Sequence, residues 1–206
     1  MGDIYTQLIT VFLGFFAIMN PIANTAAFAG LAGDKSKSEQ VKIAFKALLI
    51  TFLVILSFSI LGKAIFHLFG ITIHALRITG GILVFIVGYH MLNGKGSKLH
   101  SAQENEDSDL AVSPLAVPLL AGPGTIATAM NYAASGGLTG ILITISVFAV
   151  LCLITFICFI FSSNILSIIG ESGLSIVTRL MGLILAVIGT QMVIVGITTL
   201  ISSMGS

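Results

Sequence analysis

Residues 141–161 read ILITISVFAVLCLITFICFIF, an unbroken apolar stretch without a charged side chain. A helix needs about 20 such residues to cross a bilayer, whereas a strand of a transmembrane barrel alternates apolar and polar residues over about 10 positions. Across the whole chain, 56% of the 206 residues are hydrophobic and 8% are charged; a soluble domain carries about 25% charged residues. The sequence therefore predicts an all-α integral membrane protein.

The charged residues leave room for six transmembrane helices. We predict spans at 5–33, 43–66, 75–93, 112–134, 138–161 and 178–201. The net charge of +1 gives no basic surface for nucleic acid, and the expected surroundings are the lipid bilayer.

The basic residues predict how the chain is oriented. Seven of them fall on one side of this layout: Lys35, Lys37, Lys42, Lys46, Lys95, Lys98 and Arg179. Lys63 and Arg77 fall on the other side. Because basic residues concentrate on the cytoplasmic face, residues 94–111 are expected to form a polar cytoplasmic loop, and both termini are expected to be periplasmic.

An internal repeat appears at an offset of 102 residues. Residues 77–86 (RITGGILVFI) and 179–188 (RLMGLILAVI) share five of ten positions, and the same offset places Pro21 on Pro123. The single membrane domain 1–206 is thus predicted to contain two repeats, 1–93 and 112–206. Each has three spans, and three is odd, so the second repeat enters the membrane from the opposite side. Such inverted repeats are typical of transporters.

The paired prolines predict two broken helices, in spans one and four. A proline within a helix removes a hydrogen bond and costs about 3 kcal/mol; Gly122 and Gly124 weaken the second span further. Asn20 is a good N-cap, and proline suits the first position of a new helix. Each restart offers free N–H groups to a carboxylate. Each stop would offer free carbonyls to an ammonium group or a small cation.

The residues around these breaks are small or uncharged and polar, and they are our candidate substrate-binding residues: Asn20, Pro21, Asn24, Thr25, Gly122, Pro123, Gly124, Thr125 and Thr128. No Asp or Glu lies within a span, which favours a small neutral solute such as a zwitterionic amino acid. A coupling ion, H+ or Na+, would be held by carbonyls, Asn or Thr, or would use His90. Alternatively, the prolines only kink their helices and the small residues allow close packing; we assign Gly88 and Gly182 to packing.

No catalytic residues, metal ligands or cofactor are predicted, because Cys152 and Cys158 stand alone in an apolar block and no nucleophile has partners. The chain is therefore not expected to be an enzyme. Four further residues have roles that the sequence leaves open between interface anchoring, helix contacts, gating and a proton path: Arg77, His90, Arg179 and Gln191.

Three segments resemble the MarC family of bacterial inner-membrane proteins. They are Met19-Asn20-Pro21, residues 114–126 (PLAVPLLAGPGTI) and Arg77 with Gly80-Gly81-Ile82. The resemblance covers nearly the whole chain and implies six spans in the bacterial inner membrane and transport of neutral amino acids. We expect a secondary transporter or exporter of small neutral amino acids or similar metabolites, working by alternating access. A passive channel for small neutral solutes and a non-transport accessory protein are the alternatives.

Overall fold

The computed structural model describes all residues except 1, 71, 94–110, 112–114, 117–119 and 205–206. Its helices are α1 (Gly2–Met19), α2 (Pro21–Ala32), α3 (Lys37–Phe69), α4 (Ile73–Leu92), α5 (Pro123–Ser135), α6 (Gly137–Ile160) and α7 (Ser162–Met204). The described residues contain no strand. The expectation of an all-α fold is therefore confirmed for the part of the chain that the structure describes.

Five stretches are long and apolar enough to cross a membrane: Ile4–Ala32, Lys37–Gly62, His74–Leu92, Gly137–Ile160 and Ser172–Ser203. The fourth predicted span, 112–134, is not among them. Its second half is α5, whose 13 residues reach about 20 Å, short of a hydrocarbon core of about 30 Å. Most of its first half, like most of the predicted loop 94–111, lies outside the described residues. Five of the six predicted spans thus coincide with helices that are long and apolar enough to cross a membrane.

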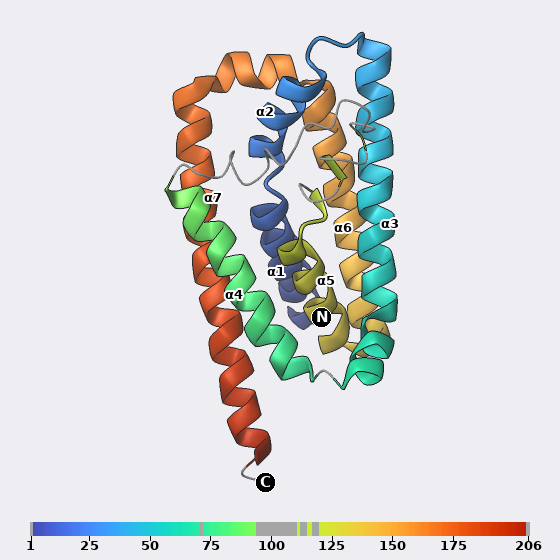
Figure 1. Cartoon of the computed structure of the whole chain (residues 1–206), viewed down its shortest axis with the longest axis vertical. Coiled ribbons are helices and arrows are strands. Elements are labelled where there is room, and N and C mark those ends of the chain that lie inside the picture. Colours follow the sequence, from blue (N-terminus) through green and yellow to red (C-terminus); the bar gives the residue numbers. More distant parts are fainter. Residues whose placement is uncertain (1, 71, 94–110, 112–114, 117–119, 205–206) are drawn as a thin grey trace.

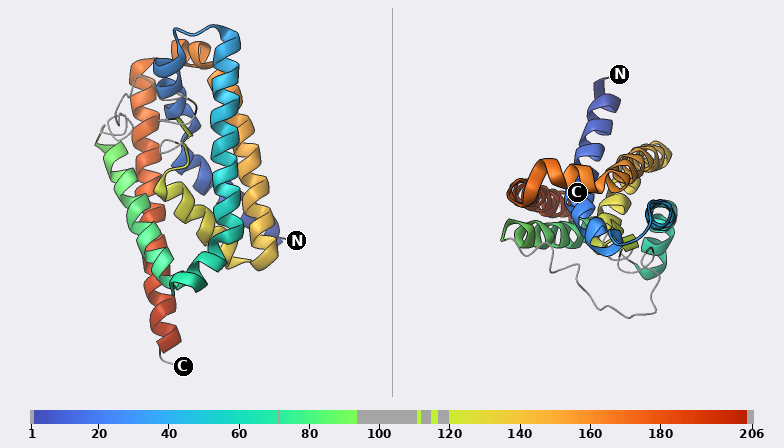
Figure 2. Two further views of the ribbon diagram at one scale, coloured as in Figure 1. Left: turned by 45° about the vertical axis from the view of Figure 1, so that its right-hand side comes forward. Right: turned by 90° about the horizontal axis from the view of Figure 1, so that it is seen from above.

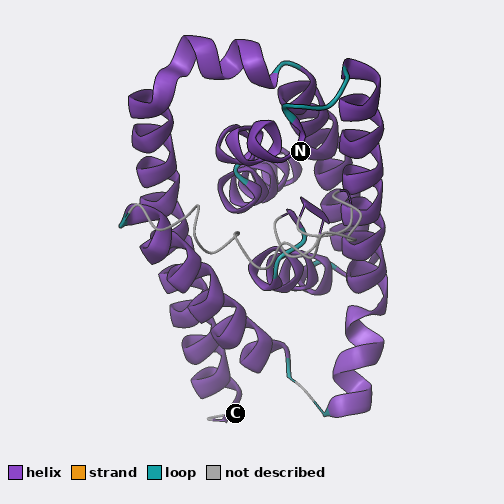
Figure 3. Cartoon of the chain, turned by 45° about the horizontal axis from the view of Figure 1, so that its top comes forward, coloured by secondary structure: helices purple, strands orange, loops and turns teal. Residues whose placement is uncertain are grey.

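The helices form two outer pairs with broken segments between them. Figures 1 and 3 show α4 beside α7 on one side and α3 beside α6 on the other, in agreement with their contacts. The α1–α2 segment and α5 lie between the pairs, and the view from above in Figure 2 shows the same arrangement. α7 turns sharply at Gly170, whose φ of 66° and ψ of 170° suit glycine. Its first segment crosses the end of the bundle (Figure 1).

The surface of the bundle is apolar, as lipid requires. Large side chains such as Phe45, Leu153 and Leu183 are more than half exposed, and a soluble protein would leave few surfaces of this kind uncovered. The interior contains buried aliphatic side chains and phenylalanine rings, of which Phe28 on α2 and Phe159 on α6 stack with ring centroids 4.5 Å apart. The helices thus pack around an interior and present apolar faces outward.

A seam of glycines joins α4 to α7. A Cβ atom on Gly88 would lie 2.5 Å from the backbone nitrogen of Ala186 and 2.6 Å from the carbonyl oxygen of Gly182. A Cβ on Gly81 would lie 2.6 Å from the carbonyl oxygen of Gly189. Gly81 thus lies opposite Gly189, and Gly88 lies opposite Gly182. Residue numbers rise along α4 while they fall along α7, so the two helices are antiparallel. Small residues allow this close backbone approach in membrane proteins, and the assignment of Gly88 and Gly182 to packing is confirmed.

Candidate functional site

The first break in the chain lies at Asn20, between α1 and α2. Asn20 has φ 40° and ψ 70°, a left-handed conformation that asparagine tolerates better than most residues. Its side-chain Oδ1 accepts a hydrogen bond from the backbone nitrogen of Ala23 at 3.2 Å, which caps α2 as the sequence predicted. Its Nδ2 is buried and has no hydrogen-bond partner. The break therefore leaves one side-chain donor unused.

Three carbonyl groups at this break accept hydrogen bonds from neighbouring residues. The Met19 carbonyl accepts from Asn24 Nδ2, and the Pro21 carbonyl accepts from Thr25 Oγ1 at 2.7 Å. The Asn20 carbonyl accepts from the Asn24 nitrogen at 3.0 Å. Two of the candidate binding residues, Asn24 and Thr25, thus spend donors on the break itself. The Met19 carbonyl is therefore in use, whereas the Ala17 carbonyl lacks its helical donor because position 21 is proline, and the ammonium or cation site at the end of α1 stays a prediction.

The second break lies at Gly122, just before α5. Gly122 is extended, with φ −70° and ψ 167°, and α5 has no side-chain cap. Before it, the nitrogen of Ala121 donates to the carbonyl of Ala116 at 2.8 Å, a wide i to i−5 turn. Pro123 occupies the first position of α5 and has no N–H. The N–H groups of Gly124 and Thr125 then follow in the first turn, where a helix supplies no internal partner.

The hydroxyl of Thr128 makes no hydrogen bond, unlike those of the other buried threonines that follow a full helical turn. Four of these donate their hydroxyl to the carbonyl four residues earlier, at 2.7–2.8 Å: Thr25, Thr51, Thr144 and Thr155. Thr128 has the same option at Gly124, yet its Oγ1 is buried without a partner. An unsatisfied buried polar group costs about 1–3 kcal/mol. Among the described residues near the breaks, Thr128 and Asn20 therefore each carry a buried side-chain atom without a hydrogen-bond partner.

The two breaks adjoin because α1 and α5 pack in opposite directions. A Cβ on Gly124 would lie 3.9 Å from the Ile18 side chain at the end of α1. Further along, Phe15 meets the ring of Tyr132 edge-on, with centroids 5.7 Å apart. The end of α1 therefore lies against the start of α5, and the buried donor of Asn20 belongs to the same region as the first turn of α5.

This region is closed in the structure. Asn20, Thr25, Thr125 and Thr128 are 3%, 0%, 5% and 1% exposed, and Pro21 and Gly124 are also buried. A groove of about 350 Å³ is found instead on the surface between α1 and α6, lined by Leu8, Ile9, Phe12, Leu13, Ser146, Val147 and Val150. Its lining is nearly all apolar and includes no candidate binding residue, so it is a feature of the lipid-facing surface.

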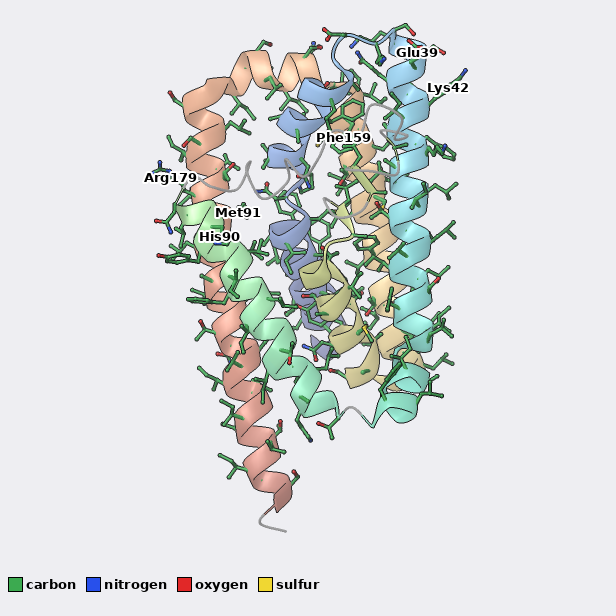
Figure 4. The ribbon with its side chains drawn as sticks, in the orientation of Figure 1. Glu39, Lys42, His90, Met91, Phe159 and Arg179 are labelled. Carbon is green, nitrogen blue, oxygen red and sulfur yellow. The ribbon has the colours of Figure 1, made fainter. Side chains whose placement is uncertain are left out.

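Arg77 connects α4 to α5, a role that the sequence left open. Its Nε donates to Oδ1 of Asn131, and its Nη2 donates to Oγ of Ser135, each at 2.8 Å. The partners lie more than 50 positions away in the chain, so no local pattern signals them. Arg179, which matches Arg77 in the sequence repeat, is exposed at the outer edge of α7, beside the end of α4 that carries His90 and Met91 (Figure 4).

The structure also locates Gln191 and His90, whose roles the sequence left open. Gln191 is exposed on α7 rather than directed at the broken segments. His90 is half-buried near the end of α4, and its Nδ1 has no hydrogen-bond partner. Neither adjoins the breaks through a described contact.

Several apolar helices of membrane-crossing length, with a broken helix and unused polar atoms inside, define this chain as a polytopic integral membrane protein. It matches the MarC family of integral membrane proteins over residues 5–201 and belongs to that family.

Relatives of the chain carry the same description. YvbG of Bacillus subtilis, a UPF0056 membrane protein, is 39% identical, with 94% of this chain and 95% of that protein covered. UPF0056 membrane proteins of Pyrococcus abyssi and of Buchnera aphidicola subsp. Schizaphis graminum are 34% and 32% identical, and at least 96% of every chain is covered. No solved structure matches the chain. The names of these relatives identify membrane proteins and specify no substrate.

Proposed function

We propose that the protein is a secondary transporter or exporter of small neutral amino acids or similar metabolites. The observation that carries this proposal is the meeting of two chain breaks inside an apolar bundle. Polar groups are expensive in such surroundings and usually mark a substrate or ion path. Here Asn20 Nδ2 and Thr128 Oγ1 remain without partners, whereas the hydroxyl of Thr25 donates to the Pro21 carbonyl. A solute with hydrogen-bonding groups would give both atoms a partner.

The second part of the proposal is the architecture of two inverted three-span repeats, 1–93 and 112–206. The glycine seam supports it. Gly81 faces Gly189 and Gly88 faces Gly182, and the two residue numbers of each pair add to 270. α4 and α7 carry the segments that match in the sequence repeat, and an inverted repeat requires its two matched helices to run in opposite directions, as these do.

Two inverted repeats around a central broken region suit alternating access. In this scheme one repeat rocks against the other, and the breaks are reached from each side in turn. The closed surroundings of Asn20 and Thr128 fit an occluded state between the two openings. A coupling ion, H+ or Na+, is part of the proposal, as are the bacterial inner membrane, the cytoplasmic loop 94–111 and periplasmic termini.

Counterflow in liposomes tests the proposal. Purified protein is reconstituted, the vesicles are loaded with unlabelled alanine, and labelled alanine is added outside. A carrier gives transient accumulation of label. A channel gives equilibration without accumulation, and an accessory protein gives no flux; either result refutes the proposal.

A matched pair of glycine variants tests whether the breaks are involved. Gly124→Leu places a large side chain at the first turn of α5 and should abolish accumulation. Gly30→Leu makes the same change on α2, where a Cβ would meet nothing within 4 Å, and should retain it. Equal activity of the two variants would place the transport path elsewhere.

A further inference from the structure

One face of α4 lies along α5, beginning at the second break. A Cβ on Gly124 would lie 3.8 Å from the side chain of Val84, and a Cβ on Gly80 would lie 3.0 Å from that of Ala127. Residue numbers fall along α4 as they rise along α5, so the two helices are antiparallel. The contact therefore starts beside the candidate binding residues and continues toward the end of α5.

The next turn of this contact is polar. Nε of Arg77 donates to Oδ1 of Asn131, and Nη2 donates to Oγ of Ser135, each at 2.8 Å. Ser135 in turn donates to the carbonyl of Asn131 at 2.7 Å. Hydrogen bonds from a charged donor are stronger than those between neutral groups. Arg77 thus holds the last turns of α5 against the beginning of α4.

These two bonds join the proposed repeats, because α4 belongs to residues 1–93 and α5 to residues 112–206. A rocking motion that separates α4 from α5 must break both of them. Figure 1 shows α5 running from the break toward the end of the bundle at which α4 begins. Thr128 lies one turn before Asn131 on the same side of α5 and is 1% exposed. Separating the two helices would therefore open a path to Thr128 from this end.

The matched contact at the other end lacks such bonds. The offset of 102 residues matches Arg179 on α7 with Arg77, and α7 contacts α2 as α4 contacts α5. The residues that match the two partners of Arg77 are Ala29 and Gly33, which have no side-chain acceptor. Arg179 itself is exposed. The two ends of the bundle are therefore held closed by different contacts.

We propose that Arg77, Asn131 and Ser135 form a latch that keeps the α5 end of the bundle closed, and that the opposite end opens more readily. The inference rests on the proposed function, since the latch determines from which side the binding region is reached. Arg77 acts through the position of α5 and does not need to contact the solute. It is thus a gating residue and not a binding residue.

Thiol labelling from each side of the membrane tests the latch in the full chain. Cys152 and Cys158 are replaced by alanine, and Thr128→Cys supplies a single buried thiol. A membrane-impermeant maleimide is added to one side of vesicles of one orientation. Two marker variants, measured separately, identify the sides. Leu138→Cys, 73% exposed at the start of α6, marks the α5 end, and Ile168→Cys, 84% exposed in the segment of α7 that crosses the bundle, marks the other end.

Weakening the latch should expose position 128 from the α5 end only. Arg77→Gln removes the charged donor, and Asn131→Ala gives the residue found at the matched position of the other repeat. Each should raise the labelling rate from that end about tenfold, as expected for loss of a hydrogen bond to a charged group. Asn131→Asp supplies a carboxylate acceptor, which strengthens the bond and should lower the rate. Arg179→Gln is the matched control and should leave the rates from both ends unchanged.

A merely structural role for Arg77 would give other results. Equal rises from both ends would mean that the whole fold has loosened, and this would overturn the latch. Unchanged rates in both weakened variants would also overturn it, as would an equal rise in Arg179→Gln. Should the weakened variants fail to fold, Asn131→Asp decides, since an unchanged or higher rate contradicts the latch. Labelling detects opening without transport, so alanine counterflow tests the proposed function separately.

Discussion

Replacing Gly88 by alanine should destabilise the protein by forcing α4 away from α7. The added Cβ would lie 2.5 Å from the backbone nitrogen of Ala186 and 2.6 Å from the Gly182 carbonyl oxygen. An ordinary contact is about 3.5 Å, so the helices must separate by about 1 Å. Backbone atoms cannot rotate away as a side chain can. The separation would also loosen the contact between Gly81 and Gly189 two turns away.

The size of the effect follows from two opposing terms. Overpacking a well-packed interface costs about 1–3 kcal/mol, and a backbone obstruction belongs at the upper end of that range. Alanine recovers about 1 kcal/mol over glycine within a helix. The net loss is therefore about 2 kcal/mol, which corresponds to a fall in the unfolding midpoint of about 4–8 °C for a chain of this size.

Two cysteines of the chain can report its thermal unfolding. It has no tryptophan, but Cys152 and Cys158 are free and partly buried in α6. A thiol-reactive fluorogenic dye therefore follows unfolding of the purified protein on heating. Gly30→Ala is the control, since a Cβ there meets nothing within 4 Å; the helix term alone should raise its midpoint by about 2–4 °C. A Gly88→Ala midpoint at or above that of the unaltered chain would refute the packing argument.

Three further substitutions test other contacts by the same measurement. Arg77→Leu should cost about 1–3 kcal/mol, because Asn131 keeps a buried acceptor without its donor; an unchanged midpoint would show that this bond contributes nothing. At Asn20, alanine should destabilise more than glycine, since a φ of 40° strains any residue with a Cβ, and the reverse order would contradict the left-handed conformation. Phe159→Ala should cost about 3–5 kcal/mol, because its ring is fully buried against Phe28; a loss below about 1 kcal/mol would mean that the two rings are not packed together.

The break in span one could be predicted because its causes are local. Proline has no N–H to continue a helix, and asparagine next to it can both adopt a left-handed conformation and cap the following helix. The structure ends α1 at Met19 and begins α2 at Pro21, with Asn20 as the cap. The apolar spans could be predicted for a similar reason, since the length of a membrane-crossing segment is set by the bilayer.

The contacts between distant segments could not be predicted in this way. Arg77 marks a helix start in the sequence, but its partners Asn131 and Ser135 depend on how α4 packs against α5. Likewise, nothing in the sequence distinguishes the hydroxyl of Thr128 from that of Thr144. One is left without an acceptor and the other donates to a carbonyl. Which donors remain free depends on all the hydrogen bonds in the folded protein. The sequence alone therefore predicts which residue types lie near the site, but not which of their atoms are free to bind a ligand.

The proposed repeats share their scaffold but not their polar groups. The offset of 102 residues matches Pro21 with Pro123 and Arg77 with Arg179, which concern backbone breaks and helix ends. It matches Thr128 with Ala26, and so offers no second hydroxyl. Asn131, which binds Arg77, is likewise matched with an alanine, so the exposed Arg179 has no equivalent acceptor. In the proposed carrier the two openings would therefore differ in energy, because these residues occur in one repeat only. This division is the one expected of a carrier in which shared packing sets the motion and unshared side chains determine what is bound.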